Sequence, residues 1–246
     1  MNQTKLQQIS DIVDQQCEDA FISGIGYVYG NLQRWPMNSQ NKEGLFTWTQ
    51  PGNVGNDPGQ IGAGHPTTQA SLTPGDVAQF TAKSPVGVYA NAYFYMALPV
   101  PEVMPTRFVD FRTHQIADLS GWQALEFQQQ LIWNGKIYNM AWQFNINGKV
   151  VRCFDYTKSQ WLPLLTIPFP DMTKPLVTIC EFAIDSFRTT HVAITINGVR
   201  YPVGVRQPAT LTTSKANKLT AGEQIDPNNK GLQCAMSVSN IELRYL

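Results

Sequence analysis

Two Asn-Gly dipeptides, each placed between runs that alternate apolar and polar residues, constrain this chain more than any other feature. Asn147-Gly148 joins two such runs between residues 137 and 156, and Asn197-Gly198 joins two between residues 191 and 203. Asn-Gly is typical of two-residue hairpin turns, because both central residues of such a turn take a positive φ. The pattern therefore predicts two antiparallel hairpins.

From Gly44 onward the chain consists of short runs of this kind separated by Gly, Pro and Asn, as in an all-β sandwich. Residues 49–68 and most of residues 207–230 are rich in turn-forming residues, and we expect them to be loops. The predicted strands are Leu45–Thr49, Val77–Ala82, Val88–Leu98, Thr106–Arg112, Ala124–Trp133, Ile137–Ile146, Val150–Tyr156, Leu176–Asp185, His191–Ile196, Val199–Val203 and Leu232–Leu246.

Residues 4–20 have a different pattern, with Leu6, Ile9 and Val13 near a 3.6-residue period, and predict an amphipathic helix. We therefore expect an N-terminal helix and extension at residues 1–43, followed by a jelly-roll β-sandwich at residues 44–246. The predicted fold is all-β, a two-sheet antiparallel jelly roll with an N-terminal helical extension. An extension of this kind docks most naturally on a neighbouring subunit or across its own sheet, and the first alternative would make a homo-oligomer through the N-terminal helix.

Charge and hydropathy exclude several classes of partner. Of the 246 residues, 18 are Lys or Arg and 18 are Asp or Glu, so the formal charges cancel and no whole-chain attraction to nucleic acid is expected. No apolar run reaches the roughly 18 residues that span a bilayer. Residues 1–17 lack a signal-peptide pattern, which leaves an intracellular chain or a mature form, and we expect an extracellular, secreted protein. The four cysteines, Cys17, Cys153, Cys180 and Cys234, form no CxxC pair, and three disulfide pairings stay open.

Residues 122–203 carry a resemblance to a known family. The segment LEFQQQLIWNGKIYNMAWQFNINGKVVRCFDYTKSQWLPL, followed by a Pro-rich turn and VAITINGVRYPV, resembles the concanavalin A-like lectin/glucanase superfamily. Leu125-Glu126-Phe127, Gln130, Trp161 and Asn197-Gly198-Val199 match motifs of that family, and about two-thirds of the chain is covered. The resemblance implies a jelly-roll sandwich, without by itself conferring a function.

The chain departs from the glucanases of this superfamily at the catalytic strand. Those enzymes resemble E-x-D-x-E, whereas Glu126, Gln128 and Gln130 occupy the three positions here. Strand alternation places all three on one face, but of the three only Glu126 can ionise. Retaining hydrolysis needs two carboxyls roughly 5–5.5 Å apart. We therefore expect no catalytic residue at this strand, with convergence of Glu181 or Asp185 on Glu126 left open.

An amide-rich sheet face is the predicted binding site. In the run 137–146, one face is apolar and belongs in the core: Tyr138, Met140, Trp142, Phe144 and Ile146. The other face adds amides to Glu126 and its neighbours, and amides supply both donors and acceptors for sugar hydroxyls. Trp161, with Tyr156 beside it, offers a flat face for a sugar ring. The predicted carbohydrate-binding residues are Glu126, Gln128, Gln130, Asn139, Gln143 and Trp161. The alternative is a solvated sheet face, with Trp161 in the core or at an oligomer contact.

No metal or cofactor is expected. The three histidines are too scattered for a metal centre, and Asp110, Arg112 and His114 share one face of a predicted strand, where they favour a structural charged network. Hard oxygen ligands in loops are equally explained by turn chemistry. These residues are Asn53, Asn56, Asp57, Asp226 and Asn228.

Three functions follow from these observations. The first is a non-catalytic, lectin-like carbohydrate-binding protein, favoured by the resemblance, the neutral charge and the amide-rich face. The second is a structural or self-assembling β-sandwich protein, favoured by the helix and the aromatic stretch Phe21–Trp35. A polysaccharide-active hydrolase or lyase is third, so the sequence leans away from an enzyme.

Overall fold

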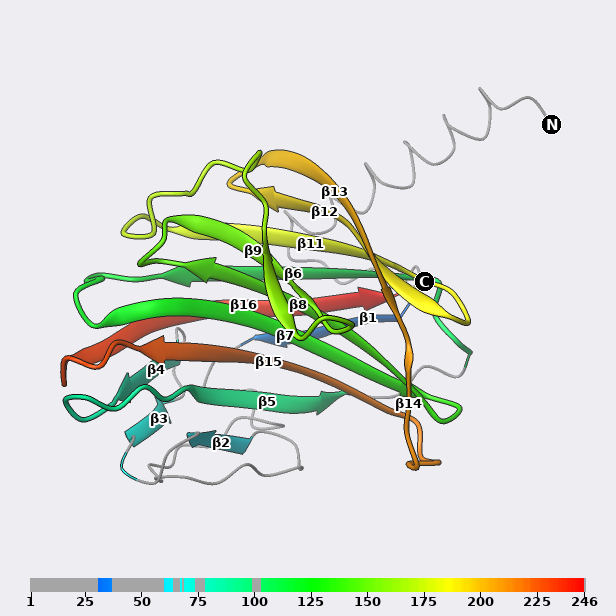
Figure 1. Ribbon diagram of the computed structural model, residues 1–246, viewed down its shortest axis with the longest axis horizontal. Coiled ribbons are helices and arrows are strands. Elements are labelled where there is room, and N and C mark those ends of the chain that lie inside the picture. The colour runs from blue at the N-terminus through cyan, green and yellow to red at the C-terminus, as the bar shows by residue number, and fades with distance from the viewer. Residues whose placement is uncertain are drawn as a thin grey trace.

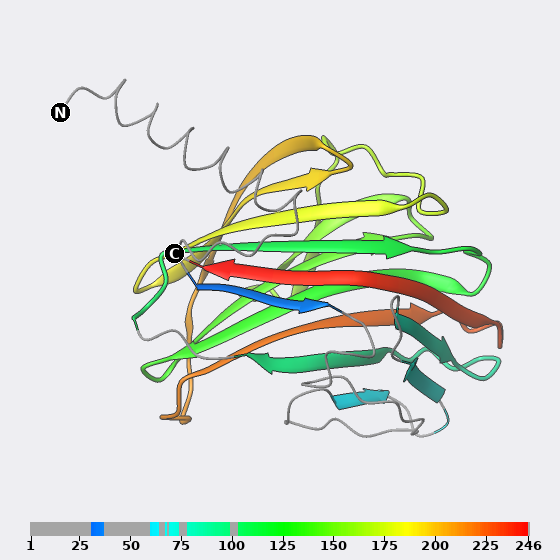
Figure 2. The same cartoon turned by 180° about the vertical axis from the view of Figure 1, so that it is seen from behind.

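Two antiparallel β-sheets, here called sheet A and sheet B, pack face to face in the computed structural model. Sheet B lies nearer the viewer in Figure 1, and sheet A lies nearer the viewer in Figure 2. The structure describes residues 31–36, 60–63, 67, 69–73, 78–98 and 103–245. These ranges hold strands and turns and no α-helix. The described residues therefore contain no helix long and apolar enough to cross a membrane.

Sheet A has β6 near its centre, between β11 and β16. All of its strand pairs are antiparallel. In spatial order the strands are β13 (Val199–Pro208), β12 (Arg188–Ile196), β11 (Leu176–Ile184), β6 (Arg107–Gln115), β16 (Gln233–Tyr245), β4 (Ala78–Lys83) and β3 (Gln69–Thr73), with β1 (Asn31–Pro36) also paired to β16.

Sheet B has β7 near its centre, between β8 and β15, and is antiparallel throughout. In spatial order the strands are β10 (Gln160–Pro163), β9 (Val150–Asp155), β8 (Lys136–Asn145), β7 (Trp122–Trp133), β15 (Lys218–Pro227), β5 (Ala92–Leu98) and β2 (Gln60–Ala63), with β14 (Thr210–Leu211) also paired to β8.

The all-β, two-sheet antiparallel sandwich is confirmed, and the predicted loops need correction. Strand β2 lies inside the expected loop 49–68, and β14 and β15 lie inside the expected loop 207–230. Strand β15 was missed because Glu223 occupies one of its core positions and Gly222 interrupts its β-propensity. Strand β1 lies within the residues predicted as the N-terminal extension. The predicted helix 4–20 and strand 45–49 fall outside the described residues.

The hairpins form as predicted, with one difference in turn geometry. Asn197 and Gly198 have φ values of 48° and 85°, as a two-residue turn requires. At the other site the turn covers residues 146–149, and the positive φ of 49° falls on Lys149 instead of the Asn-Gly pair. A third Asn-Gly pair, Asn134-Gly135, has φ values of 46° and 73° and joins β7 to β8. The same dipeptide signal was present there in the sequence.

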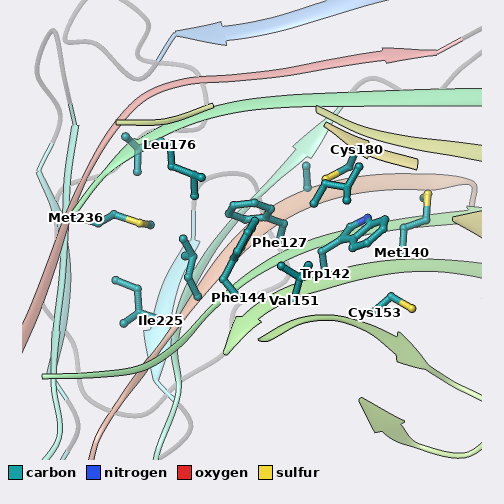
Figure 3. Close-up of a cluster of buried hydrophobic side chains, with 14 of the residues drawn as sticks. Phe127, Met140, Trp142, Phe144, Val151, Cys153, Leu176, Cys180, Ile225 and Met236 are labelled. Carbon is teal, nitrogen blue, oxygen red and sulfur yellow. The ribbon is translucent and has the colours of Figure 1, made fainter. Parts of the chain in front are cut away.

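The space between the sheets is filled by large apolar side chains (Figure 3). Phe127 and Phe144 of sheet B meet edge to face at 5.6 Å, and Trp142 lies beside them. The apolar face predicted for β8 is buried as expected. Among the cysteines, Cys153, Cys180 and Cys234 are buried free thiols, and Cys17 falls outside the described residues.

A charged cluster is buried in the middle of this apolar layer. Asp110, Arg112 and His114 extend inward from β6, and Glu223 extends inward from β15 on the opposite sheet. The Arg112 guanidinium lies 2.7 Å from Asp110 and 3.2 Å from Glu223. His114 Nε2 lies 2.5 Å from Glu223 Oε1. The network predicted for the β6 residues is therefore present, and its fourth member comes from β15.

Removal of the Arg112 charge should strongly destabilise the fold. We expect Arg112→Met to lower the free energy of unfolding by about 3–5 kcal/mol, because it leaves buried carboxylates without a counter-charge. Urea denaturation measures this loss. Arg206 is exposed on β13, and the matched Arg206→Met control should change stability by less than about 0.5 kcal/mol. Equal losses in the two variants would contradict the role of the buried cluster.

A second buried histidine makes the fold sensitive to acid. His191 packs against Trp142 and Phe182, with ring centroids 5.2 Å apart in both cases. Burial among these rings lowers the pKa of His191 to about 4. The unfolded chain binds this proton near its ordinary pKa of about 6.5, so acid favours the unfolded state. Stability from this group is complete above about pH 6.5 and is lost as the pH falls towards 4.

The acid sensitivity can be assigned by substitution. Between pH 6.5 and 4, His191 should account for about 3 kcal/mol of lost stability, from 1.36 kcal/mol per pKa unit. We expect His191→Phe to unfold with a correspondingly shallower pH dependence over this interval, measured by urea denaturation at several pH values. An unchanged slope in the variant would show that His191 is not the group that titrates.

Candidate functional site

The outer face of sheet B brings the predicted polar residues together. Alternation along β7 places Glu126, Gln128 and Gln130 on this face, opposite Phe127 and the core. On β8, Gln143 is paired with Glu126 and Asn139 with Gln130. Five of the six predicted site residues therefore form one continuous polar surface across two strands.

A pocket of about 360 Å³ opens on this surface. Its lining comes from β5, β15, β7 and β8 and from Tyr156, which follows β9. The lining residues are Tyr93, Phe94, Tyr95, Gln128, Gln129, Gln130, Asn139, Tyr156, Lys218, Thr220, Ala221, Gly222 and Glu223. Gln128, Gln130 and Asn139 of the predicted set thus line the pocket, and Glu126 and Gln143 lie beside it on the same face.

Gly222 of β15 forms part of the floor of the pocket. Gly222 is opposite Gln128 on one side and Tyr95 on the other, so it occupies the middle of the floor. A Cβ atom at this position would lie 2.5 Å from the Phe94 carbonyl oxygen and 2.7 Å from Tyr95 Cβ. Only glycine fits the close approach of β15 and β5, and the floor there is bare backbone.

Hydrogen bonds orient the amides of the lining. Gln130 Nε2 donates to Asn139 Oδ1 over 2.8 Å, which leaves the Gln130 carbonyl oxygen and the Asn139 amide group for a ligand. Tyr93 stacks on Tyr95 with centroids 5.5 Å apart, and its hydroxyl is buried without a partner among the described residues. The pocket therefore presents an acceptor and a donor to whatever enters it.

Tyr156 is held in place from another strand. Buried Gln207, at the end of β13, accepts a hydrogen bond from Tyr156 N over 2.9 Å and donates one to the Phe154 carbonyl oxygen. Because both bonds are to backbone, they position the chain where it leaves β9. The wall of the pocket at Tyr156 is thus set by the opposite sheet.

Two carboxyls meet at the side of the pocket. Glu126 is 4% exposed, and Asp226 lies on the neighbouring strand β15, two residues beyond Gln224, the register partner of Glu126. Burial and the charge of Asp226 raise the pKa of Glu126 to about 8. Burial also raises the pKa of Asp226, to about 6. The pair therefore holds a proton at neutral pH.

An amide network surrounds this carboxyl pair. Glu126 accepts hydrogen bonds from Gln143 Nε2 over 2.8 Å and from Gln128 Nε2 over 3.0 Å. Asp226 accepts one from Gln224 Nε2 over 2.9 Å. Gln224 also accepts a bond from Gln128 Nε2 over 3.3 Å, which closes a ring between β7 and β15. Gln128 is the member of this ring that also lines the pocket.

Trp161 lies on the same face, at its far edge. It is paired with Phe154 across β9 and β10, and their rings meet edge to face at 5.0 Å. Its side chain is half-buried and does not belong to the lining of the pocket. The role predicted for Trp161 in sugar binding stays a prediction.

Several other residues fall away from the site. Glu181 lies on sheet A, where both carboxylate oxygens bind Arg200, and Asp185 binds Arg188 in the turn after β11. Neither converges on Glu126. In the described part of the chain, no group of three or more His, Cys, Asp and Glu side chains is arranged to hold a metal ion. Asp226, considered above as a loop ligand, is in a strand.

The sequence missed Asp226, Gln224 and Thr220 because their strand was expected to be a loop. Tyr93 and Tyr95 were missed for another reason. Their strand was predicted, but nothing in its sequence indicated which strands lie beside it in the sheet. The two-residue spacing of the tyrosines did place both on one face.

No protein-family model matches this chain, and no curated protein sequence matches it either. Among solved structures it is similar to alginate lyase Aly36B, with 12% identity and a TM-score of 0.48 over 87% of this chain and 97% of that one. It is similar to the carbohydrate recognition domain of Emp46p, with 10% identity and a TM-score of 0.44 over 75% and 88%. Arcelin-5, a lectin-like defence protein of Phaseolus vulgaris, aligns with 11% identity and a TM-score of 0.44 over 82% and 98%. Similarity at this level does not distinguish a binding protein from an enzyme.

Proposed function

We propose that this protein binds neutral oligosaccharides, without cleaving them, on the outer face of sheet B. The observation that carries the proposal is the pocket of about 360 Å³ whose lining combines amides with three tyrosines. Binding sites for small molecules are concave, with a few polar groups placed to orient the ligand. This pocket has that composition and size.

The polar groups suit hydroxyls, which both donate and accept hydrogen bonds. The Gln130 carbonyl oxygen and the Asn139 amide supply both kinds of partner within one pocket. Tyr95 and Tyr156 add aromatic surface on opposite sides, against which the apolar face of a sugar ring packs.

Charge also favours a neutral ligand. The Glu223 carboxylate faces the core and is occupied by His114 and Arg112, so it does not enter the pocket as a free charge. The carboxyl pair beside the pocket is enclosed by amides and shares a proton. Lys218 is the cationic member of the lining.

Substitutions that separate aromatic from amide contacts test the proposal. On an array of neutral and acidic glycans, we expect Tyr95→Ala to weaken binding of the best ligand by more than tenfold, about 1.4 kcal/mol, since stacking supplies a large contact area. Gln130→Ala should weaken it by about two- to tenfold, the value of one hydrogen bond. Calorimetry measures both, and thermal melting confirms that each variant is folded.

Trp161→Ala distinguishes three possible roles of Trp161: a sugar contact, a core residue and an assembly contact. A loss of affinity beyond tenfold would place a sugar ring at the edge of sheet B. A loss of about 3–5 kcal/mol in stability would mark Trp161 as core, and a lower oligomer mass would mark it as an assembly contact. If no variant of the pocket changes binding of a glycan that the parent binds, the outer face of sheet B is not the site.

A second candidate function, a polysaccharide hydrolase, gains support from one observation. Asp226 supplies a second carboxyl beside Glu126, which the sequence pattern of β7 lacked. Retaining hydrolysis requires carboxyls about 5–5.5 Å apart and inverting hydrolysis about 6.5–9.5 Å. Neither Glu126 nor Asp226 belongs to the lining of the pocket, so we place hydrolysis second.

Enzymatic assay tests this ranking. We expect no release of reducing sugar from β-glucans, and no unsaturated product from uronate polysaccharides, because neither carboxyl of the pair belongs to the lining of the pocket. The assay measures reducing ends and absorbance of the unsaturated product over several hours. Activity that is present in the parent and lost in both Glu126→Gln and Asp226→Asn would reverse the order of the two functions.

A further inference from the structure

We propose that Glu126 and Asp226 position Gln128 for the ligand, and that the proton shared by the two carboxyls controls glycan binding. The inference rests on the function proposed above and names a control of the same site. Glu126 and Asp226 act here as positioning residues, because Gln128 is the member of their network that lines the pocket.

An amide network brings the two carboxyls together. Gln128 donates to Glu126 and to Gln224, and Gln224, the register partner of Glu126, donates to Asp226. We infer that the two buried carboxyls share a hydrogen bond there, and because an ionised carboxylate accepts hydrogen bonds and donates none, one of them then carries a proton. The two strands hold the carboxyls together, so loss of the proton would leave two like charges in contact.

Gln128 links the protonation state of the two carboxyls to the pocket. Its amide group donates to Glu126 Oε2 and to Gln224 Oε1 at once, and Gln224 in turn donates to Asp226. With both amide bonds made on the carboxyl side, the Gln128 carbonyl oxygen is left for the ligand. Repulsion between two ionised carboxylates would pull Glu126 and Asp226 apart and disturb both bonds that orient Gln128.

Other titratable groups face the pair from neighbouring strands. From β9, Arg152 donates to Gln143. Burial, with Glu126 adding to it, raises the pKa of Tyr156 above its ordinary value, and burial raises the pKa of Tyr93 to about 12. On β16, burial raises the pKa of Cys234 to about 12. Among the described residues that face the pair, the shared proton is therefore the one that titrates near pH 8.

The sign of the effect follows from which state binds. Between about pH 6 and 8 the pair holds one proton, and below pH 6 it gains a second and stays uncharged. In both states the carboxyls remain hydrogen-bonded, and Gln128 stays in place. Above pH 8 the shared proton is lost, so affinity should fall, by at most about tenfold per pH unit for one proton.

The experiment measures Kd against pH for the parent and three variants. The probe is the glycan of highest affinity on the array, titrated by calorimetry from pH 5 to 9.5. For the parent we expect a constant Kd up to about pH 7.5 and at least a tenfold rise by pH 9.5. Glu126→Gln keeps a donor for Asp226 but removes the group that titrates near pH 8. This variant should raise the Kd at pH 7 by up to about tenfold, the value of one hydrogen bond, and should remove the rise in Kd at alkaline pH.

Two further variants complete the test. Burial still raises the pKa of Glu126 in Asp226→Asn, but an ionised Glu126 then meets no like charge, so the alkaline rise should also disappear. Glu181→Gln makes the same chemical change on sheet A, away from the pocket, and should keep the parental profile. Thermal melting at each pH confirms that the variants are folded. A flat parental profile, or an alkaline rise that persists in Glu126→Gln, would overturn the inference.

An infrared titration of the ligand-free protein separates this inference from the proposed function. The carbonyl stretch of a protonated carboxyl should persist in the parent at pH 7, disappear above about pH 9 and be missing at pH 7 in Glu126→Gln. If this band behaves as expected but no glycan binds at any pH, the shared proton stands and the proposed function fails, together with the control of binding. If glycans bind and the band is missing at pH 7, the shared proton is refuted and the proposed function stands.

Discussion

The buried guanidinium of Arg112 joins the two sheets directly beneath the pocket. It leaves β6 of sheet A, crosses the apolar layer and donates to the Gly222 carbonyl oxygen of sheet B over 2.7 Å. Asp110 balances its charge from the same strand, and Glu223 from the opposite one. Gly222 also forms part of the floor of the pocket, so this one residue of β15 contacts the buried charge on its inner side and lines the binding site on its outer side. A cluster of this kind adds little net stability, but its disruption is costly.

The same strand, β15, presents a carboxyl to each side of sheet B. Glu223 faces inward and is neutralised by His114 and Arg112, and these charges lower its pKa even though desolvation acts in the opposite direction. Asp226 faces outward, and burial raises its pKa although its contacts with Gln224 and Glu126 act in the opposite direction. One strand therefore carries two buried acids whose pKa values are shifted in opposite directions.

Close contact between Glu126 and Asp226 decides what the outer face can do chemically. Carboxyls separated by the width of a water molecule or a sugar bond can share acid and base roles in hydrolysis. Carboxyls in direct contact share one proton, and the surrounding amides are committed to holding them. This arrangement favours a binding surface whose polar groups are fixed in advance, with Gln128, Gln130 and Asn139 oriented before a ligand arrives.

Strand alternation and turn chemistry already determined much of this protein. The sandwich class, the buried face of β8 and the outward set Glu126, Gln128 and Gln130 all follow from local rules of period and turn type. Tertiary pairing decided the rest. Asp226 lies 100 residues from Glu126 in the chain, on a strand whose buried Glu223 hid its apolar pattern, and the cation that makes this burial tolerable comes from the opposite sheet. Local sequence specifies which face a side chain takes, but which carboxyls, tyrosines and charges become neighbours depends on strand order and register, because those contacts join segments far apart in the chain.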